Sequence, residues 1–183
     1  MLQIHTVSGA FSAEECDRIL VLAGNATSND AGLVGQATNH NLPRADLVWL
    51  DDVEGTGWIM DRIIDVVRDT NRAVYDFALT DFSESAQVAR YGAEREGHFS
   101  WHSDIGDGPI AARRKLTMVV QLSEPEGYEG GLLEVMPSAH TVKADQARGT
   151  ATLFPSYLLH RVTPGTKGER YSLTIWSHGP GFR

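Results

Sequence analysis

The fold of this 183-residue chain is decided by residues 150–177, which read TATLFPSYLLHRVTPGTKGERYSLTIWS. Three runs rich in β-branched and aromatic residues alternate there with short segments of Pro, Gly and Ser: Thr150–Phe154, Leu158–Val162 and Tyr171–Ser177. Such residues favour strands, and Gly and Pro mark the turns between them. The stretch therefore predicts antiparallel strands rather than helices.

The same pattern extends back to Ala86. Four more runs of strand-forming residues precede the first three, at Gln87–Tyr91, His98–Ser103, Leu116–Leu122 and Leu132–Met136. No helical segment separates these strands, which excludes alternating β–α–β units and favours an antiparallel sandwich or barrel. Residues 86–178 are thus expected to form a β core.

The first 85 residues carry two helical patterns. Ser12 and Glu15 form a capping box, and apolar residues follow at helical spacing. A second helix is expected from Trp58 to Tyr75, with Met60, Ile63, Ile64 and Val67 on its buried stripe. Residues 2–7 and 45–50 suggest two further short strands. We expect residues 1–85 to form a helical support region packed on the larger sheet, within one domain over residues 1–183.

Composition excludes several classes of protein. The net charge of −8 disfavours a polyanionic partner, so neither nucleic acid nor a membrane surface is expected. The local exception, Arg113-Arg114-Lys115, is interpreted as the solvated start of a strand. Cys16, the one cysteine, cannot form an internal disulfide. With no signal-peptide pattern and no long apolar span, a cytoplasmic monomer or homodimer is expected.

Trp101-His102-Ser103-Asp104 contains the residues most suggestive of chemistry. Alternate side chains of a strand point to the same face, so His102 and Asp104 are expected to converge on one point. A third ligand must come from elsewhere, and His160 is the best candidate. Two His and one carboxylate on one face of an octahedral ion form the facial triad of non-haem iron(II) oxygenases.

Arg170 and Ser172 follow His160 after a segment of turn-forming residues. Folded as a hairpin centred near Gly165, this segment would set Arg170 roughly opposite His160. A guanidinium in that place can hold a carboxylate through two parallel hydrogen bonds, and Ser172 can add a hydroxyl. A keto acid that chelates the metal at one end would find a charged anchor at the other.

The chain resembles the prolyl 4-hydroxylase-like branch of the iron(II)/2-oxoglutarate oxygenases, which includes the PKHD-type hydroxylases. The resemblance covers residues 87–178, and its motifs are Tyr91-Gly92, His102-Ser103-Asp104, Glu129-Gly130-Gly131-Leu132-Leu133, Phe154-Pro155-Ser156, Leu159-His160-Arg161-Val162-Thr163-Pro164 and Gly168-Glu169-Arg170-Tyr171-Ser172 through Trp176. It implies a mainly β fold, the double-stranded β-helix or jelly roll. It also implies iron(II), 2-oxoglutarate and O2 as reactants, succinate and CO2 as by-products, and ascorbate to keep the iron reduced.

The chain departs from this family in the residues around the keto acid. Two extra residues lie between Tyr91 and His102, Phe99 stands where relatives usually carry Tyr, and Gln121 stands where some relatives place a Tyr that binds 2-oxoglutarate. Tyr91 and then Gln121 are our candidates for the neutral donors of that site. Candidate substrate contacts are Trp176, Arg44, Trp49 and His98.

The sequence thus predicts an oxygenase that hydroxylates an unactivated C–H bond, with His102, Asp104 and His160 as metal ligands. Peptidyl proline, a free amino acid and a small metabolite all remain open as substrates. Two alternatives come from other classes: a cupin-type metal enzyme that uses no 2-oxoglutarate, and a non-catalytic β-sandwich that binds a partner. The acidic charge balance disfavours a nucleic-acid demethylase.

Overall fold

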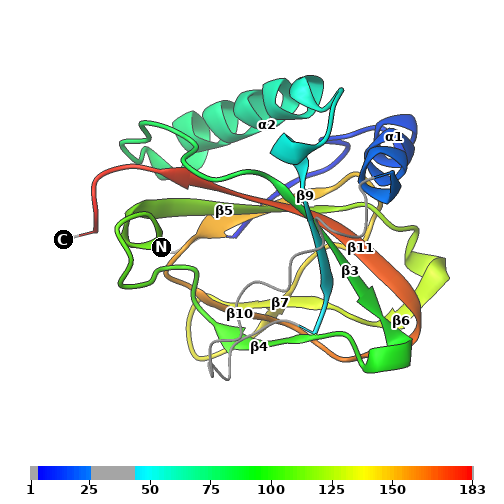
Figure 1. The fold of residues 1–183 in the computed structure, drawn as a ribbon. Helices are drawn as coiled ribbons and strands as arrows, with labels where there is room; N and C mark the ends of the chain where they lie inside the picture. The colour runs from blue at the N-terminus through cyan, green and yellow to red at the C-terminus, as the bar shows by residue number, and fades with distance from the viewer. Residues whose placement is uncertain (1–3, 26–43, 183) are drawn as a thin grey trace.

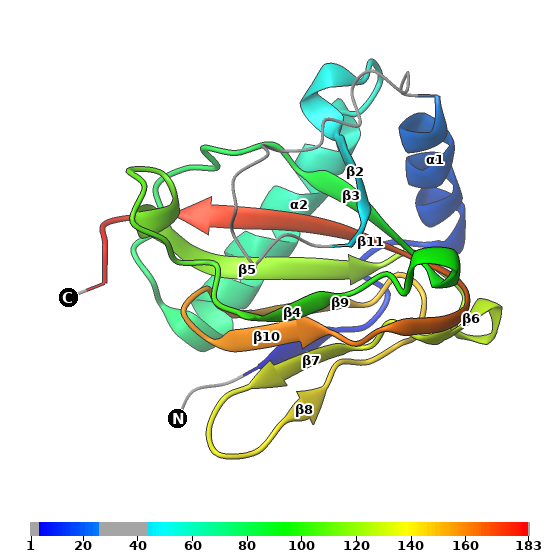
Figure 2. The same cartoon turned by 60° about the horizontal axis from the view of Figure 1, so that its bottom comes forward.

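Two antiparallel sheets face each other in the structure, a computed structural model that describes residues 4–25 and 44–182. Helices α1 (Ala13–Gly24) and α2 (Gly57–Thr70) lie together on the outer face of the larger sheet (Figure 1). The smaller sheet lies on the side of the larger one that faces away from α1 and α2 (Figure 2). This is the double-stranded β-helix arrangement that the sequence predicted. No helix in the described ranges is long and apolar enough to cross a membrane.

The larger sheet has the strand order β1-β9-β5-β11-β3-β2, and β6 pairs with the start of β11. Its strands are β1 (His5–Val7), β2 (Asp46–Trp49), β3 (Gln87–Gly92), β5 (Arg114–Gln121), β6 (Tyr128–Gly130), β9 (Ala151–Pro155) and β11 (Gly165–His178). The smaller sheet has the order β4-β10-β7-β8, from β4 (Phe99–His102), β7 (Leu133–Met136), β8 (Val142–Lys143) and β10 (Leu159–Val162). Short helical turns join them: η1 (Leu50–Asp52), η2 (Asn71–Tyr75), η3 (Ala93–Arg95), η4 (Ala111–Arg113) and η5 (Pro125–Gly127).

Each of the seven strand runs predicted after Ala86 corresponds to a strand, while the short strands β6 and β8 were not expected. Residues 1–85 contribute strands to the larger sheet as well as helices, because β1 pairs with β9 and β2 pairs with β3. These two strands lie at the two ends of the larger sheet's strand order.

Successive side chains of a strand point to opposite faces of the sheet. One face of the larger sheet therefore contributes to the apolar core under the helices, and the other face lines the space between the two sheets. On one face of the larger sheet, strand residues pack with residues of both helices in one cluster; its members include Val88, Met118, Val120, Leu173, Ile175, Cys16, Ile19, Ile59, Ile63 and Val67. The residues between them in sequence point toward the smaller sheet, among them Thr117, Arg170 and Ser172. The functional side chains therefore project from a sheet that the helices support from behind.

Helix α1 begins at the predicted capping box. Glu15 N donates to Ser12 Oγ at 3.1 Å, and Ser12 N donates to Glu15 Oε2 at 2.8 Å. The buried stripe predicted for α2 is partly wrong. Ile59, Ile63, Val67 and Thr70 are buried, whereas Ile64 is 41% exposed. The stripe is rotated toward Ile59, a direction that the sheet beneath the helix decides.

The predicted hairpin at Gly165 is also wrong in its pairing. β10 belongs to the smaller sheet and β11 to the larger one, so the chain crosses between sheets at residues 163–165. Pro164 O accepts from Gly131 N at 3.2 Å during this crossing. Gly130 has a φ of 72°, and a Cβ there would lie 2.1 Å from Pro164 O. Glycine is therefore required where the crossing passes β6.

The rotated stripe of α2 generates a matched pair of substitutions. We expect Ile63→Ala to lower the free energy of unfolding by about 2–5 kcal/mol, because it leaves a cavity under the helix. Ile64→Ala, in the next residue of the same helix, is expected to cost less than about 1 kcal/mol because its side chain is partly in solvent. Urea unfolding of both variants measures the difference. Equal decreases in the free energy of unfolding would contradict the assignment of Ile63 to the buried stripe and Ile64 to its edge.

Candidate active site

Three residues that the sequence separates by up to 58 positions meet between the sheets. His102 ends β4, Asp104 follows it by two residues, and His160 lies on β10 as the direct partner of His102. Their ligand atoms lie within 4.8 Å of one another. The pairing of β4 with β10 thus brings the two imidazoles together.

Hydrogen bonds to backbone carbonyls orient both imidazoles. His102 Nδ1 lies 2.7 Å from Ser100 O, and His160 Nδ1 lies 3.0 Å from Leu158 O. A carbonyl oxygen can only accept, so each Nδ1 carries a proton, and the neutral form of each ring has its lone pair on Nε2. The Nε2 atoms lie 3.7 and 3.4 Å from the Asp104 carboxylate oxygens. This is the tautomer that a metal ligand requires.

Asp104 is buried, at 8% exposure, and is held at both its backbone and its carboxylate. Its N–H donates to Ser156 O at 2.9 Å, and Thr117 Oγ1 donates to its Oδ2 at 2.6 Å. Burial alone would raise its pKa. The imidazoles of His160 and His102 and the Thr117 hydroxyl outweigh that effect, so the pKa of Asp104 lies below its ordinary value. The carboxylate is therefore ionised at neutral pH.

His102 is uncharged under the same conditions. Burial and then repulsion from His160 lower its pKa to about 4. Two imidazole nitrogens and one carboxylate oxygen, all within 4.8 Å of one another, form the donor set of a facial triad and fit iron(II).

A bulge in β4 changes which side chains share the face of His102. His160 pairs with His102 while Val162 pairs with Phe99, so two residues of β10 span three of β4. Phe99 therefore lines the cavity and its ring stacks on His102, with centroids 3.5 Å apart. His98 was predicted on this face from a regular strand, but it lies outside the cavity lining and its Nδ1 is 2.7 Å from Glu96 O.

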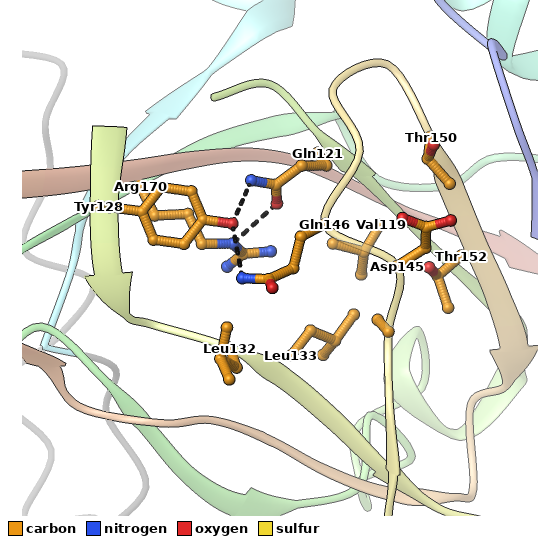
Figure 3. A pocket seen from close by; sticks show the side chains of 11 residues that line it. Val119, Gln121, Tyr128, Leu132, Leu133, Asp145, Gln146, Thr150, Thr152 and Arg170 are labelled. Carbon is orange, nitrogen blue, oxygen red and sulfur yellow. Dashed lines mark hydrogen bonds between the residues drawn. The ribbon is translucent and has the colours of Figure 1, made fainter. Parts of the chain in front are cut away.

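Arg170 lies in the same cavity as the triad, on the facing strand β11. Ser172, Thr174 and Trp176 follow it on the same face and also line the cavity. Arg170 is 3% exposed; its Nε donates to Gln121 Oε1 at 2.9 Å, while its buried Nη1 has no hydrogen-bond partner among residues 4–25 and 44–182 (Figure 3). A buried N–H without a partner is costly, so this atom is suited to an anionic ligand.

The two candidate neutral donors occupy different places. Tyr91 lines the triad cavity, and its ring centroid lies 5.6 Å from Arg170 Cζ. Gln121 lines a second, smaller cavity that shares Val119, Leu133 and Arg170 with the first. Gln121 thus contacts Arg170 from the far side rather than facing the triad.

The candidate substrate contacts are only partly brought together. Trp176 lines the triad cavity. Arg44 has a side chain 62% exposed, 3.8 Å from Glu96, and does not line it. Trp49 pairs with Gln87, which does line the cavity, so Trp49 lies beside it on the same sheet face.

Sequence reasoning missed several residues of the site, notably Arg114. The solvated start of a strand predicted there is wrong for Arg114, because its side chain is 17% exposed and bridges to Glu84. Its Nη1 donates to Asp104 O at 2.9 Å, and its Cζ lies 4.0 Å from the Trp176 ring centroid. Thr117, Leu47 and Tyr128 were also missed. Alternation with Gln121 on β5 could have indicated Thr117, whereas nothing in the sequence indicated Tyr128.

Residues 86–178 match the family described as the 2OG-Fe(II) oxygenase superfamily, and the chain belongs to this family. Similar curated proteins are PKHD-type hydroxylases. One from Hyphomonas neptunium is 39% identical over 72 residues, which is 39% of this chain and 32% of that protein. One from Pseudomonas putida is 28% identical over 180 residues, covering 93% of this chain and 76% of the relative. The first of these alignments spans only about a third of the relative's length.

Solved structures share the fold. A Pseudomonas putida prolyl-4-hydroxylase superposes with a TM-score of 0.74 at 20% identity, covering 99% of this chain and 95% of that one. A Trichoplax adhaerens prolyl hydroxylase, in complex with a peptide fragment of hypoxia inducible factor, gives 0.75 at 17% identity over 96% and 83% of the two chains. Members of the family use iron(II), 2-oxoglutarate and O2, and the triad and Arg170 suit these reactants.

The triad generates a prediction on metal binding. We expect His160→Ala to weaken binding of Mn²⁺ or Fe²⁺ by more than about 100-fold, because loss of a ligand costs at least as much as loss of its supporting contact. His98→Ala removes a histidine from the same region but outside the cavity, so its metal affinity should equal that of the parent. Anaerobic titration calorimetry makes the comparison. Parent-like affinity in His160→Ala would remove His160 from the site.

The lowered pKa of His102 generates a prediction on the metal-free protein. Between pH 6.5 and about 4 the unfolded chain binds a proton at His102 that the folded chain does not. Stability must therefore fall as pH decreases through this window, by about 3 kcal/mol from this group. Urea unfolding at several pH values should show a shallower decline in His102→Gln. The exposed His140→Gln serves as control, and equal slopes in all three proteins would contradict the prediction.

Proposed function

We propose that this chain hydroxylates an unactivated C–H bond, using iron(II), 2-oxoglutarate and O2 and releasing succinate and CO2. One observation carries the proposal: a single cavity contains both a three-ligand metal site and a buried guanidinium with an unpartnered N–H. A keto acid with a second carboxylate has the two ends that such a cavity requires. Membership of the 2OG-Fe(II) oxygenase family supports the same reaction class.

The residues of the chain have separate roles in this proposal. His102, Asp104 and His160 would hold iron and leave the opposite face of the ion open. Iron and 2-oxoglutarate, when bound, supply the oxidising chemistry by coupling decarboxylation of the keto acid to oxygen insertion. Arg170 would pair with the distal carboxylate and so fix the orientation of the keto group.

Supporting contacts keep the ligands in place. Thr117 and Arg114 hold the side chain and the backbone of Asp104, respectively. Phe99 covers one face of the His102 ring, and Leu47, Val119, Leu133 and Val162 give the cavity apolar walls. Apolar walls exclude water from the reacting atoms, which limits side reactions.

The proposed substrate is an amino-acid side chain, either within a peptide or as a free amino acid or small metabolite. The cavity also has neutral polar groups in Gln87 and Thr174. Such groups can bind amides and carbonyls. The peptide complex of the Trichoplax relative supports a peptidyl substrate, with proline as the first residue to test.

The proposal extends to the whole chain as one oxygenase domain, with residues 1–85 as support and residues 86–178 as core. A cytoplasmic monomer or homodimer that binds neither nucleic acid nor membrane is consistent with the net charge of −8. Ascorbate would act as an external reductant. A cupin-type enzyme that uses no 2-oxoglutarate would not account for the buried, unpaired charge of Arg170. A non-catalytic binding module would not account for the three metal-ligand side chains that meet in one cavity.

Arg170 gives the direct test. We expect Arg170→Ala to raise the dissociation constant for 2-oxoglutarate by about 10- to 1,000-fold in the Mn²⁺-loaded, oxygen-free protein, because hydrogen bonds to a charged group are lost. Affinity for Mn²⁺ should change little. Arg170→Lys should recover part of the binding, since a point charge lacks the planar fork.

Arg161→Ala is the matched control, because Arg161 pairs with Glu134 outside the cavity. Titration calorimetry measures binding, and succinate release from 2-oxoglutarate in air measures turnover of the parent and each variant. An unchanged dissociation constant in Arg170→Ala would refute the assignment. A parent protein that binds metal but neither binds nor consumes 2-oxoglutarate would favour the cupin-type alternative.

A further inference from the structure

Arg170 is a buried cation without an anionic partner among the described residues. It forms no ion pair in the structure, and Gln121, a neutral amide, is the partner of its Nε. A carboxylate at the Gln121 position would neutralise the guanidinium and compete with any incoming anion. The neutral partner instead holds the side chain while leaving its full charge available. Burial disfavours such an arrangement unless a ligand compensates it.

The orientation of Gln121 is set by its neighbours. Its Nε2 lies 3.3 Å from Ser123 O, a carbonyl that can only accept, and 2.7 Å from Tyr128 Oη. Reversing the amide would place its NH2 against Arg170 Nε–H and its oxygen against the Ser123 carbonyl. Both contacts would be repulsive, so Gln121 Oε1 must face Arg170.

Tyr128 has a hydroxyl proton that no residue accepts in the described part of the chain. Its Oη accepts from Gln121 Nε2 at 2.7 Å and from Gln146 Nε2 at 3.4 Å, and the Arg170 side chain also hydrogen-bonds to it. A hydroxyl has two lone pairs and one proton, so with both lone pairs in use the proton remains to be donated. Tyr128 is 6% exposed and lines the smaller cavity together with Arg170 (Figure 3).

We propose that Tyr128 is a binding residue for the distal carboxylate of the co-substrate, donating its O–H beside Arg170, and that Gln121 is the positioning residue for both. This inference rests on the proposed function. The two cavities share Arg170, Val119 and Leu133, so a carboxylate at Arg170 lies where the triad cavity meets the Tyr128 cavity. Tyr128 lies on β6 and Gln121 at the end of β5, so two different strands supply the two residues.

The test is 2-oxoglutarate binding to Mn²⁺-loaded, oxygen-free protein by titration calorimetry. Tyr128→Phe removes only the hydroxyl and should raise the dissociation constant about 10- to 100-fold, with Mn²⁺ affinity unchanged. Tyr171→Phe is the matched control, because Tyr171 is adjacent to Arg170 in sequence but packs against the cluster on the helix side of the sheet. It should bind 2-oxoglutarate like the parent.

Gln121→Glu tests whether the neutrality of Gln121 matters for 2-oxoglutarate affinity, a quantity that a purely structural role of this residue would not change. It keeps the shape and the hydrogen bond to Arg170 and adds a counter-charge, and its second oxygen replaces the Nε2 that faces Tyr128 Oη, so it can also accept the Tyr128 hydroxyl proton. We expect 2-oxoglutarate affinity to fall at least about 10-fold while Mn²⁺ affinity stays unchanged. This variant also keeps the proposal testable if Tyr128→Phe does not fold.

The outcomes separate the two proposals. Unchanged 2-oxoglutarate affinity in Tyr128→Phe or in Gln121→Glu, with normal binding by the parent, would overturn this inference and leave the proposed function in place. Loss of affinity in both, with Tyr171→Phe normal, supports it. A parent that binds Mn²⁺ but no 2-oxoglutarate would overturn the proposed function, and this inference with it.

Discussion

Two buried charges of opposite sign line one cavity in this protein without pairing with each other. Asp104 is held by Thr117 and flanked by two imidazoles, and Arg170 is held by a neutral glutamine. If the two side chains could move freely, they would approach each other, because burying an ion pair costs less free energy than burying two separate charges. Their separation must therefore be imposed by the two sheets, and it creates a cavity with a metal-binding end and an anion-binding end.

The rigidity that keeps them apart comes from the strands and from the layer behind them. Arg170 lies on β11, which pairs with β3 on one side and β5 on the other, and Asp104 is bonded to Ser156 and Arg114. The reverse face of this sheet is packed under both helices. Groups fixed in this way lose little freedom when ligands bind, so less of the binding energy is spent on ordering them.

The space between the sheets consists of two cavities that share Arg170, and different polar groups line each of them. The triad side has apolar walls and neutral polar groups, whereas the Tyr128 side is a smaller cavity lined by amide and hydroxyl groups and by the Asp145 carboxylate. Arg170 stands at the boundary and belongs to both. Gln121, the partner of Arg170 Nε, is neutral, so under the proposed function the charge of Arg170 stays available for the co-substrate. The same cavity would then hold a diacid at one end and expose another molecule to the metal at the other.

Local sequence patterns were sufficient for the strands after Ala86 other than β6 and β8, for the capping box at Ser12 and for the residue types of the triad, because period-two alternation and capping depend on neighbours in the chain. The resemblance carried in these motifs also indicated the family. Tertiary structure alone decided the rest. The bulge in β4 moved Phe99 into the cavity and His98 out of it, and the sheet beneath α2 selected Ile59 over Ile64 for burial. The crossing at residues 163–165 placed His160 and Arg170 on facing sheets instead of in one hairpin. These features depend on contacts between distant segments, whose energies do not appear in any local pattern of residues.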